Sequence, residues 1–75
     1  MMSKLEIGTR ISAIRDIWVK ESHVIYGTFG IVLSWRINGF SGGSLWWYDV
    51  IFDDGHRTWV TQHDILAASD MHIPF

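Results

Sequence analysis

Short β-branched and aromatic segments separated by glycines set the strongest limit on what this chain can fold into. The glycines lie at Gly8, at Gly27 and Gly30, in a cluster over residues 39–43, and at Gly55. No stretch between them repeats apolar residues at the 3.6-residue period of an amphipathic helix. Glycines that flank β-prone segments are typical of strands joined by turns. We therefore expect an all-β domain with no helix longer than two turns.

This pattern predicts five strands and two loops. The first strand alternates Ile11 and Ala13 with Arg10 and Ser12, which predicts one apolar and one polar face. Residues 15–23 are charged and polar and are expected to form a long loop or a bent hairpin tip, and residues 38–44 an exposed flexible loop. The expected strands are residues 8–14, 29–37, 45–53, 57–60 and 65–66.

Two local signals join the later strands. Asp54-Gly55 follows an apolar segment and predicts a hairpin turn, because both residue types tolerate positive φ. Thr61 is expected to cap a short helical turn before the last strand. A sheet of such short strands exposes its edges unless it curls shut. The predicted fold is a small five-stranded barrel over residues 8–66, with an N-terminal extension (1–7) and a C-terminal tail (67–75).

Composition excludes several classes of protein. Apolar residues make up 48% of 75 residues, a fraction too high for intrinsic disorder and a length suited to one domain. The lack of cysteine excludes disulfides and thiolate metal sites and favours a cytoplasmic location. No segment has the roughly 20 apolar residues of a membrane span. The four histidines lack metal-site spacing, and we expect no cofactor.

The tryptophans raise a packing problem. Successive strand residues point to opposite faces, so Trp46, Tyr48 and Phe52 are expected inside while Trp47 points outward. Trp59 is expected to point outward as well, between Thr58 and Val60. A small barrel cannot enclose eleven aromatic residues. At least one of Trp18, Trp47 and Trp59 is therefore expected to be substantially exposed beside another exposed aromatic residue.

The order of these features resembles a Tudor domain of the SH3-like barrel superfold. The resemblance spans about residues 8–66 and is most specific in the Tyr-x-Val-x-Phe-Asp-Asp-Gly segment at residues 48–55. The other matching segments are Gly8-Thr9-Arg10-Ile11, Gly30-Ile31-Val32, Val60 and Asp64-Ile65-Leu66.

This resemblance implies a binding module rather than an enzyme. Tudor domains that read methyl-lysine hold the cation in an aromatic cage assisted by an acidic residue. By position, Phe52 matches a cage aromatic and Asp54 the acidic residue. Trp18 and Tyr26 are the candidates from the first loop. His56 stands where an aromatic residue is usual in the family.

The leading hypothesis is a non-enzymatic module that binds a protein, a peptide or a second copy of itself, as a stand-alone bacterial or phage regulator would. The alternatives are a nucleic-acid-binding barrel, for which Lys20, Arg36 and Arg57 interleave with tryptophans, and a methyl-lysine reader. Ser41 and Ser44 have no paired base, so nothing supports nucleophilic catalysis. The candidate partner-binding residues are Trp18, Tyr26, Trp47, Phe52, Asp54, His56 and Trp59.

Overall fold

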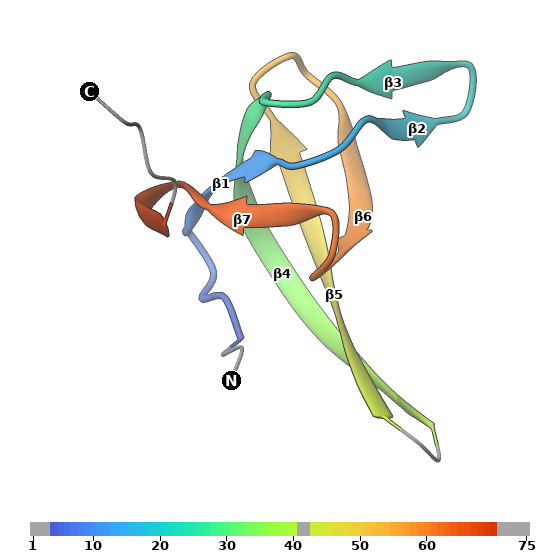
Figure 1. Ribbon diagram of the computed structural model, residues 1–75, viewed down its shortest axis with the longest axis vertical. Coiled ribbons are helices and arrows are strands. Elements are labelled where there is room, and N and C mark those ends of the chain that lie inside the picture. The colour runs from blue at the N-terminus through green and yellow to red at the C-terminus, as the bar shows by residue number, and fades with distance from the viewer. Residues whose placement is uncertain (1–3, 41–42, 71–75) are drawn as a thin grey trace.

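A sheet of five antiparallel strands makes up most of the structure (Figure 1). The computed structural model describes residues 4–40 and 43–70. The strands pair in the order β6-β5-β4-β1-β7. They are β1 (Arg10–Ala13), β4 (Phe29–Phe40), β5 (Gly43–Phe52), β6 (Arg57–Thr61) and β7 (Ile65–Ala67). The only helical element among the described residues is a 3-10 turn, η1 (Ala68–Asp70). The all-β prediction is confirmed.

The core lies against one face of this sheet. Tyr48, Val50 and Phe52 are almost completely buried, as the predicted alternation along β5 requires, and Trp46 packs against them. Ile11 and Val60 add to the core from β1 and β6. Ser12 is buried too, at 0% exposure. The polar face predicted for β1 is wrong at this position, because β1 lies between β4 and β7 inside the sheet.

Of the predicted barrel, the structure confirms the five strands and their antiparallel pairing. β6 and β7 lie at the two ends of the strand order. No ladder joins β6 to β7 among the described residues, so closure of the sheet stays a prediction. The last strand is one residue longer than expected and ends at Ala67.

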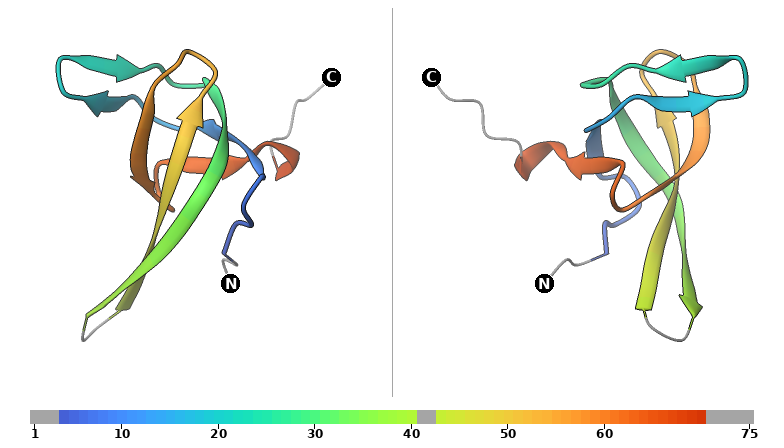
Figure 2. Two further views of the ribbon diagram at one scale, coloured as in Figure 1. Left: turned by 180° about the vertical axis from the view of Figure 1, so that it is seen from behind. Right: turned by 45° about the vertical axis from the view of Figure 1, so that its right-hand side comes forward.

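Strands β4 and β5 extend well beyond the other strands as a two-stranded arm (Figures 1 and 2). The loop predicted for residues 38–44 is wrong for most of its length. Asn38 pairs with Leu45, Gly39 with Ser44 and Phe40 with Gly43, and residues 41–42 lie outside the described part. Ladder hydrogen bonds outweigh the local preference of these glycines for a loop.

Strand β4 contains one irregularity. Val32 pairs with Val50 but Ser34 pairs with Asp49, so Leu33 has no residue opposite it and forms a β-bulge. Beyond the bulge, Trp35 lies opposite the buried Tyr48. One extra residue in a strand is absorbed in this way without changing the faces on which the later residues lie.

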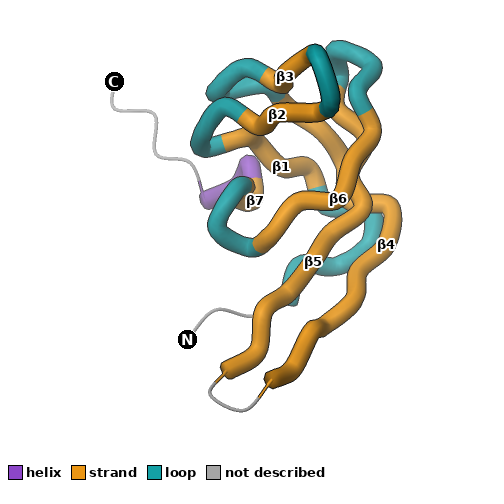
Figure 3. Tube along the Cα trace, turned by 90° about the vertical axis from the view of Figure 1, so that its right-hand side faces the viewer, coloured by secondary structure: helices purple, strands orange, loops and turns teal. Residues whose placement is uncertain are grey.

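Residues 15–23 contain a hairpin, one of the two alternatives expected for them. β2 (Ile17–Val19) and β3 (Ser22–Val24) form a separate two-stranded sheet, which projects at the end opposite the β4–β5 arm (Figures 1 and 3). Lys20 makes the turn with a φ of 57°. Ile17 and Val24 anchor the hairpin in the core.

Both predicted turn signals are confirmed. Phe52 donates its N–H to His56 O at 2.7 Å, and Gly55 donates its N–H to Phe52 O at 2.9 Å, which closes a three-residue loop. Gly55 alone takes positive φ in this loop, at 97°. Asp64 Oδ2 accepts a hydrogen bond from Thr61 N at 2.8 Å while Thr61 Oγ1 accepts one from His63 N. This reciprocal cap holds a single turn before β7.

Candidate functional site

The seven predicted site residues lie in five parts of the molecule. Trp18 belongs to the β2–β3 hairpin and Tyr26 to the loop after it. Asp54 and His56 flank Gly55 in the β5–β6 turn, Trp47 and Trp59 lie on the outer face of the sheet, and Phe52 lies in the core. Phe52 is 2% exposed, so its ring is not available at the surface.

The β2–β3 hairpin contacts the β5–β6 turn through a polar chain of three residues. Ser22 Oγ lies 2.8 Å from His56 Nε2, and His56 Nδ1 lies 2.9 Å from Asp54 Oδ2. Asp54 Oδ1 also accepts a hydrogen bond from His56 N at 2.9 Å. Sequence analysis missed the role of Ser22, since 34 residues separate it from His56 and no local pattern joins them.

These three residues have the order of a hydrolase triad but not its geometry. The Asp54 carboxylate lies off the direction of the His56 Nδ1–H bond, so this short contact forms no aligned hydrogen bond. In a working triad that bond orients the imidazole. Ser22 is also exposed. The arrangement is better suited to fixing the hairpin against the turn than to activating a nucleophile.

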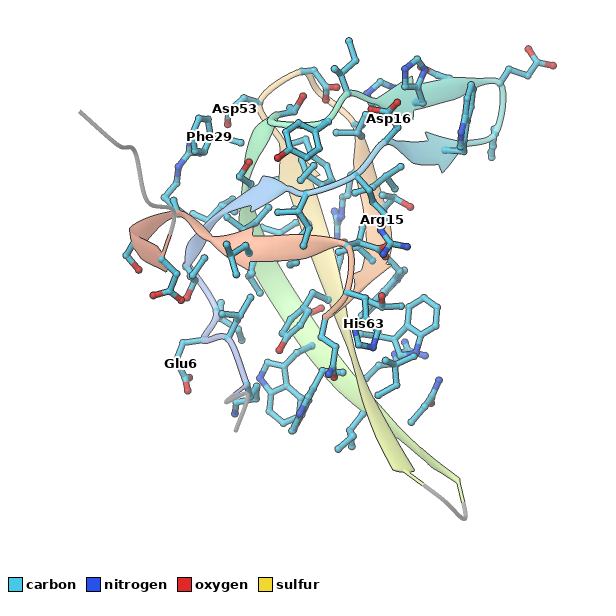
Figure 4. All side chains as sticks on the ribbon, viewed as in Figure 1. Glu6, Arg15, Asp16, Phe29, Asp53 and His63 are labelled. Carbon is cyan, nitrogen blue, oxygen red and sulfur yellow. The ribbon has the colours of Figure 1, made fainter. Side chains whose placement is uncertain are left out.

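The Asp54 carboxyl is stabilised in its charged form. Burial acts to raise its pKa, but the hydrogen bond from the His56 backbone N–H and the short contact with the His56 ring outweigh burial and hold the pKa below its ordinary value. The neighbouring Asp53 accepts two hydrogen bonds from the Arg10 guanidinium, which lower its pKa as well. Arg10 also lies 5.7 Å from the Phe29 ring centroid, and Figure 4 shows Phe29 and Asp53 side by side at the start of β4.

The predicted aromatic residues of the hairpin region are exposed but separate. Trp18 is 70% exposed, so the expected exposure of one of the three tryptophans is confirmed. The ring beside it, 4.6 Å away between centroids, is the partly buried imidazole of His23 and not an exposed Phe, Tyr or Trp. Tyr26 is 64% exposed, and its N–H donates to Asp16 Oδ1 at 2.8 Å. No ring contact joins Trp18 to Tyr26 in the described part of the chain.

The outer face of strands β4, β5 and β6 carries the second group of predicted aromatics. Trp47 and Trp59 line a groove of about 230 Å³ together with Arg36 and Asn38. The Arg36 guanidinium carbon lies 4.4 Å from the Trp59 ring centroid, a cation–π contact. Trp59 is 39% exposed, and Trp47 is partly buried. We call these four residues the outer groove.

One carboxylate lies on the same face as the outer groove, and it is already paired. Asp49 Oδ1 and Oδ2 accept hydrogen bonds from Arg57 Nε at 3.2 Å and Arg57 Nη2 at 2.8 Å. Asp49 is 7% exposed, so this forked ion pair is partly protected from solvent, and it leaves little of the Asp49 charge for a ligand.

The opposite face of the β4–β5 arm is apolar and carries the Trp35–Trp46 pair, whose ring centroids lie 5.4 Å apart in an edge-to-face arrangement. Lys4 Nζ lies 4.0 Å from the Trp35 ring centroid. Ile37 on the same face is 45% exposed. The arm was not predicted from sequence, because residues 38–44 were expected to form a loop. Extending the in–out alternation of side chains through Asn38 would have predicted its two faces.

Other kinds of site find no support in the described residues. Within residues 4–40 and 43–70, no three histidine, aspartate or glutamate side chains gather as metal ligands would. Among the same residues, no helix is long and apolar enough to cross a membrane. Ser41, one of the serines considered above, lies outside the described residues.

Comparison with known proteins found no match among family models, curated proteins or solved structures.

Proposed function

We propose that this protein is a non-enzymatic interaction module that binds a peptide or protein partner through the outer groove. The observation that carries the proposal is the groove lined by the half-exposed Trp59 and the partly buried Trp47, with the Arg36 guanidinium over the Trp59 ring. Tryptophan and arginine are the residue types most often found at energetic hot spots of interfaces. Soluble monomers rarely expose clustered aromatic side chains without a use for them.

The proposed scaffold is an SH3-like, Tudor-like barrel. Its support is the strand order β6-β5-β4-β1-β7, the hairpin inserted between β1 and β4, and the single capped turn that precedes β7. The lack of cysteine suits a reducing compartment such as the cytoplasm. A methyl-lysine cage has less support than the outer groove, because Phe52 is buried and Asp54 is engaged by His56.

Selection from a displayed peptide library tests the proposal, with the intact chain as bait. Peptides selected on the natural protein should lose roughly 30-fold in affinity with Trp59→Thr, the equivalent of about 2 kcal/mol for a hot-spot residue. Trp18→Thr is the matched control, because it removes an exposed tryptophan from another strand of the molecule.

Two outcomes would contradict the proposal. If no peptide is enriched over an empty support, the module does not recognise peptides. If the selected peptides are insensitive to Trp59→Thr but lost with Trp18→Thr, the binding site is on the β2–β3 hairpin instead of the outer groove.

A further inference from the structure

We infer that the outer groove binds the carboxylate of an acidic side chain on its protein partner. This inference rests on the proposed function and adds the chemistry of the partner to it. The groove supplies one positive charge without a counterion and several hydrogen-bond donors, between two aromatic side chains.

Arg36 differs from the other arginines in having no carboxylate partner among the described residues. Arg10 pairs with Asp53, Arg15 with Asp64 and Arg57 with Asp49, whereas the Arg36 guanidinium lies over the Trp59 ring. A guanidinium that lies over a ring can still use the N–H groups in its own plane to form a forked pair with a carboxylate. Arg36 therefore offers an oriented charge that nothing in the described structure neutralises.

Trp47 provides a second, independent observation. Its Nε1–H is buried and has no acceptor in the described part of the chain, although a buried indole N–H usually finds a partner. Trp47 lines the same groove as Arg36 and the Asn38 amide. This unsatisfied N–H belongs to a residue that lines the groove, beside the donors that Arg36 and Asn38 supply there.

The size of the groove fits one side chain. The groove is an open depression with a volume of about 230 Å³. That is enough space for the end of a glutamate or aspartate side chain and a few remaining waters. Flanking indoles lower the local polarity and strengthen the attraction between a carboxylate and Arg36.

The charge pattern favours a protein partner over nucleic acid. A polynucleotide is held by a track of several cations that neutralise successive phosphates. On this face Arg57 is engaged by Asp49, which leaves Arg36 as the single uncompensated cation of the described residues there. The whole chain carries a formal charge of −2. A single carboxylate matches this arrangement.

The test follows the indole N–H resonances of the full-length, isotope-labelled protein by NMR. The probes are two blocked tripeptides, N-acetyl-Ala-Glu-Ala-amide and its neutral glutamine analogue. The glutamate peptide should shift the Trp47 and Trp59 indole resonances in a saturable manner and leave that of Trp18 in place. The glutamine peptide should bind about tenfold more weakly, the order expected for loss of a charged hydrogen-bonded pair.

Substitutions at two arginines supply the matched controls. Arg36→Gln should weaken binding of the glutamate peptide about tenfold, and Arg36→Lys should restore part of the loss because it keeps the charge but not the fork. Arg10→Gln should have no effect, since Arg10 lies on β1 beside Asp53. Dispersed indole resonances in the free variants, with that of the distant Trp18 unchanged, show that each variant is folded.

Several results would overturn the inference. These are equal shifts with both peptides, no shift with the glutamate peptide, or binding that survives Arg36→Gln. Tighter, steeply salt-dependent binding of a single-stranded oligothymidylate would replace the carboxylate with a phosphate track. Library peptides that depend on Trp59 but contain no acidic residue would leave the proposed function intact and contradict this inference alone.

Discussion

Gly30 occupies a position in β4 where no side chain fits. A Cβ atom there would lie 2.8 Å from Ile51 O and 3.0 Å from side-chain atoms of Val50 and Phe52. Because the 2.8 Å contact is with backbone, β5 itself would have to move. Gly30→Ala should destabilise the protein by about 1–3 kcal/mol, as overpacked cores do.

Urea unfolding followed by tryptophan fluorescence measures this loss. Ser34→Ala, further along the same strand, is the control and should change stability by less than about 0.5 kcal/mol. An unchanged unfolding midpoint for Gly30→Ala would mean that β4 and β5 approach each other less closely than the structure shows.

The Asp54 carboxyl makes stability depend on acid pH. Its pKa is lower in the folded chain than in the unfolded chain, so its contribution is fully present above the unfolded pKa, near 4. The contribution is lost as pH falls through the lower, folded pKa. Asp54→Asn should therefore cost stability at neutral pH and cost progressively less as the pH falls below about 4.

Thermal unfolding of the natural chain and of Asp54→Asn from neutral to acid pH measures the difference. Asp53 titrates in the same window, so the variant should keep part of the acid destabilisation. A difference between the two proteins that stays constant with pH would show that the His56 contacts do not stabilise the charged form of Asp54.

At the scale of elements, the outer half of β4 pairs with β5 alone among the described residues, so its other edge is free there. Both main-chain groups of Trp46 bond to Gln62. Trp46 O accepts a hydrogen bond from the Gln62 N–H, and the Trp46 N–H donates one to Gln62 Oε1. The Trp46 main chain therefore points away from β4. The residue opposite it, Ile37, is in a non-hydrogen-bonded pair, and its own N–H points outward, as does that of Trp35 two residues earlier.

Amide hydrogen exchange should reveal this edge as an alternation along β4. Trp35 and Ile37 should exchange much faster than Arg36, whose N–H points toward β5, because an amide without a main-chain partner is not protected by the ladder. Equal protection of the three amides would mean that the edge is covered in solution.

The elements also show what could be predicted from sequence. The turn at Gly55 and the cap at Thr61 follow from local chemistry, and both were predicted correctly. The extent of β4 and β5 beyond Ile37 was not, since glycines at 39 and 43 favour a loop locally and only pairing across the arm makes them strand. Burial of Ser12 depends on having strands on both sides of β1, which no local pattern contains.

In the candidate site too, features set by local alternation could be predicted, and contacts between distant elements could not. Strand alternation was sufficient to place Trp47 on the outer face and Phe52 in the core. It could not show that Arg36 crosses β5 to reach Trp59, because that contact joins strands that are not paired with each other. The Ser22–His56 contact could not be predicted from sequence either, because it also joins elements that are not paired with each other.

On the scale of the whole molecule, the exposed indoles report whether the surface is open or shared between copies. Trp18 is 70% exposed and Trp59 39%, so acrylamide should quench a large part of the tryptophan fluorescence. With a single open surface, the quenching should be the same across a dilution series. Quenching that increases only on dilution would identify the aromatic surface as a contact between copies and contradict an open groove.

The bulge at Leu33 makes β4 one residue longer than its ladder requires. Val32 faces inward and Ser34 lies opposite Asp49, so deletion of Leu33 would leave a strand of regular alternation in which Arg36 still shares a face with Trp59. Natural length variation in a strand usually exchanges its two faces. Here a single-codon deletion should straighten the arm and keep the outer groove, which a crystal structure of the shortened chain would show. Strand β4 thus has a position at which the chain can lose one residue while the outer groove stays the same.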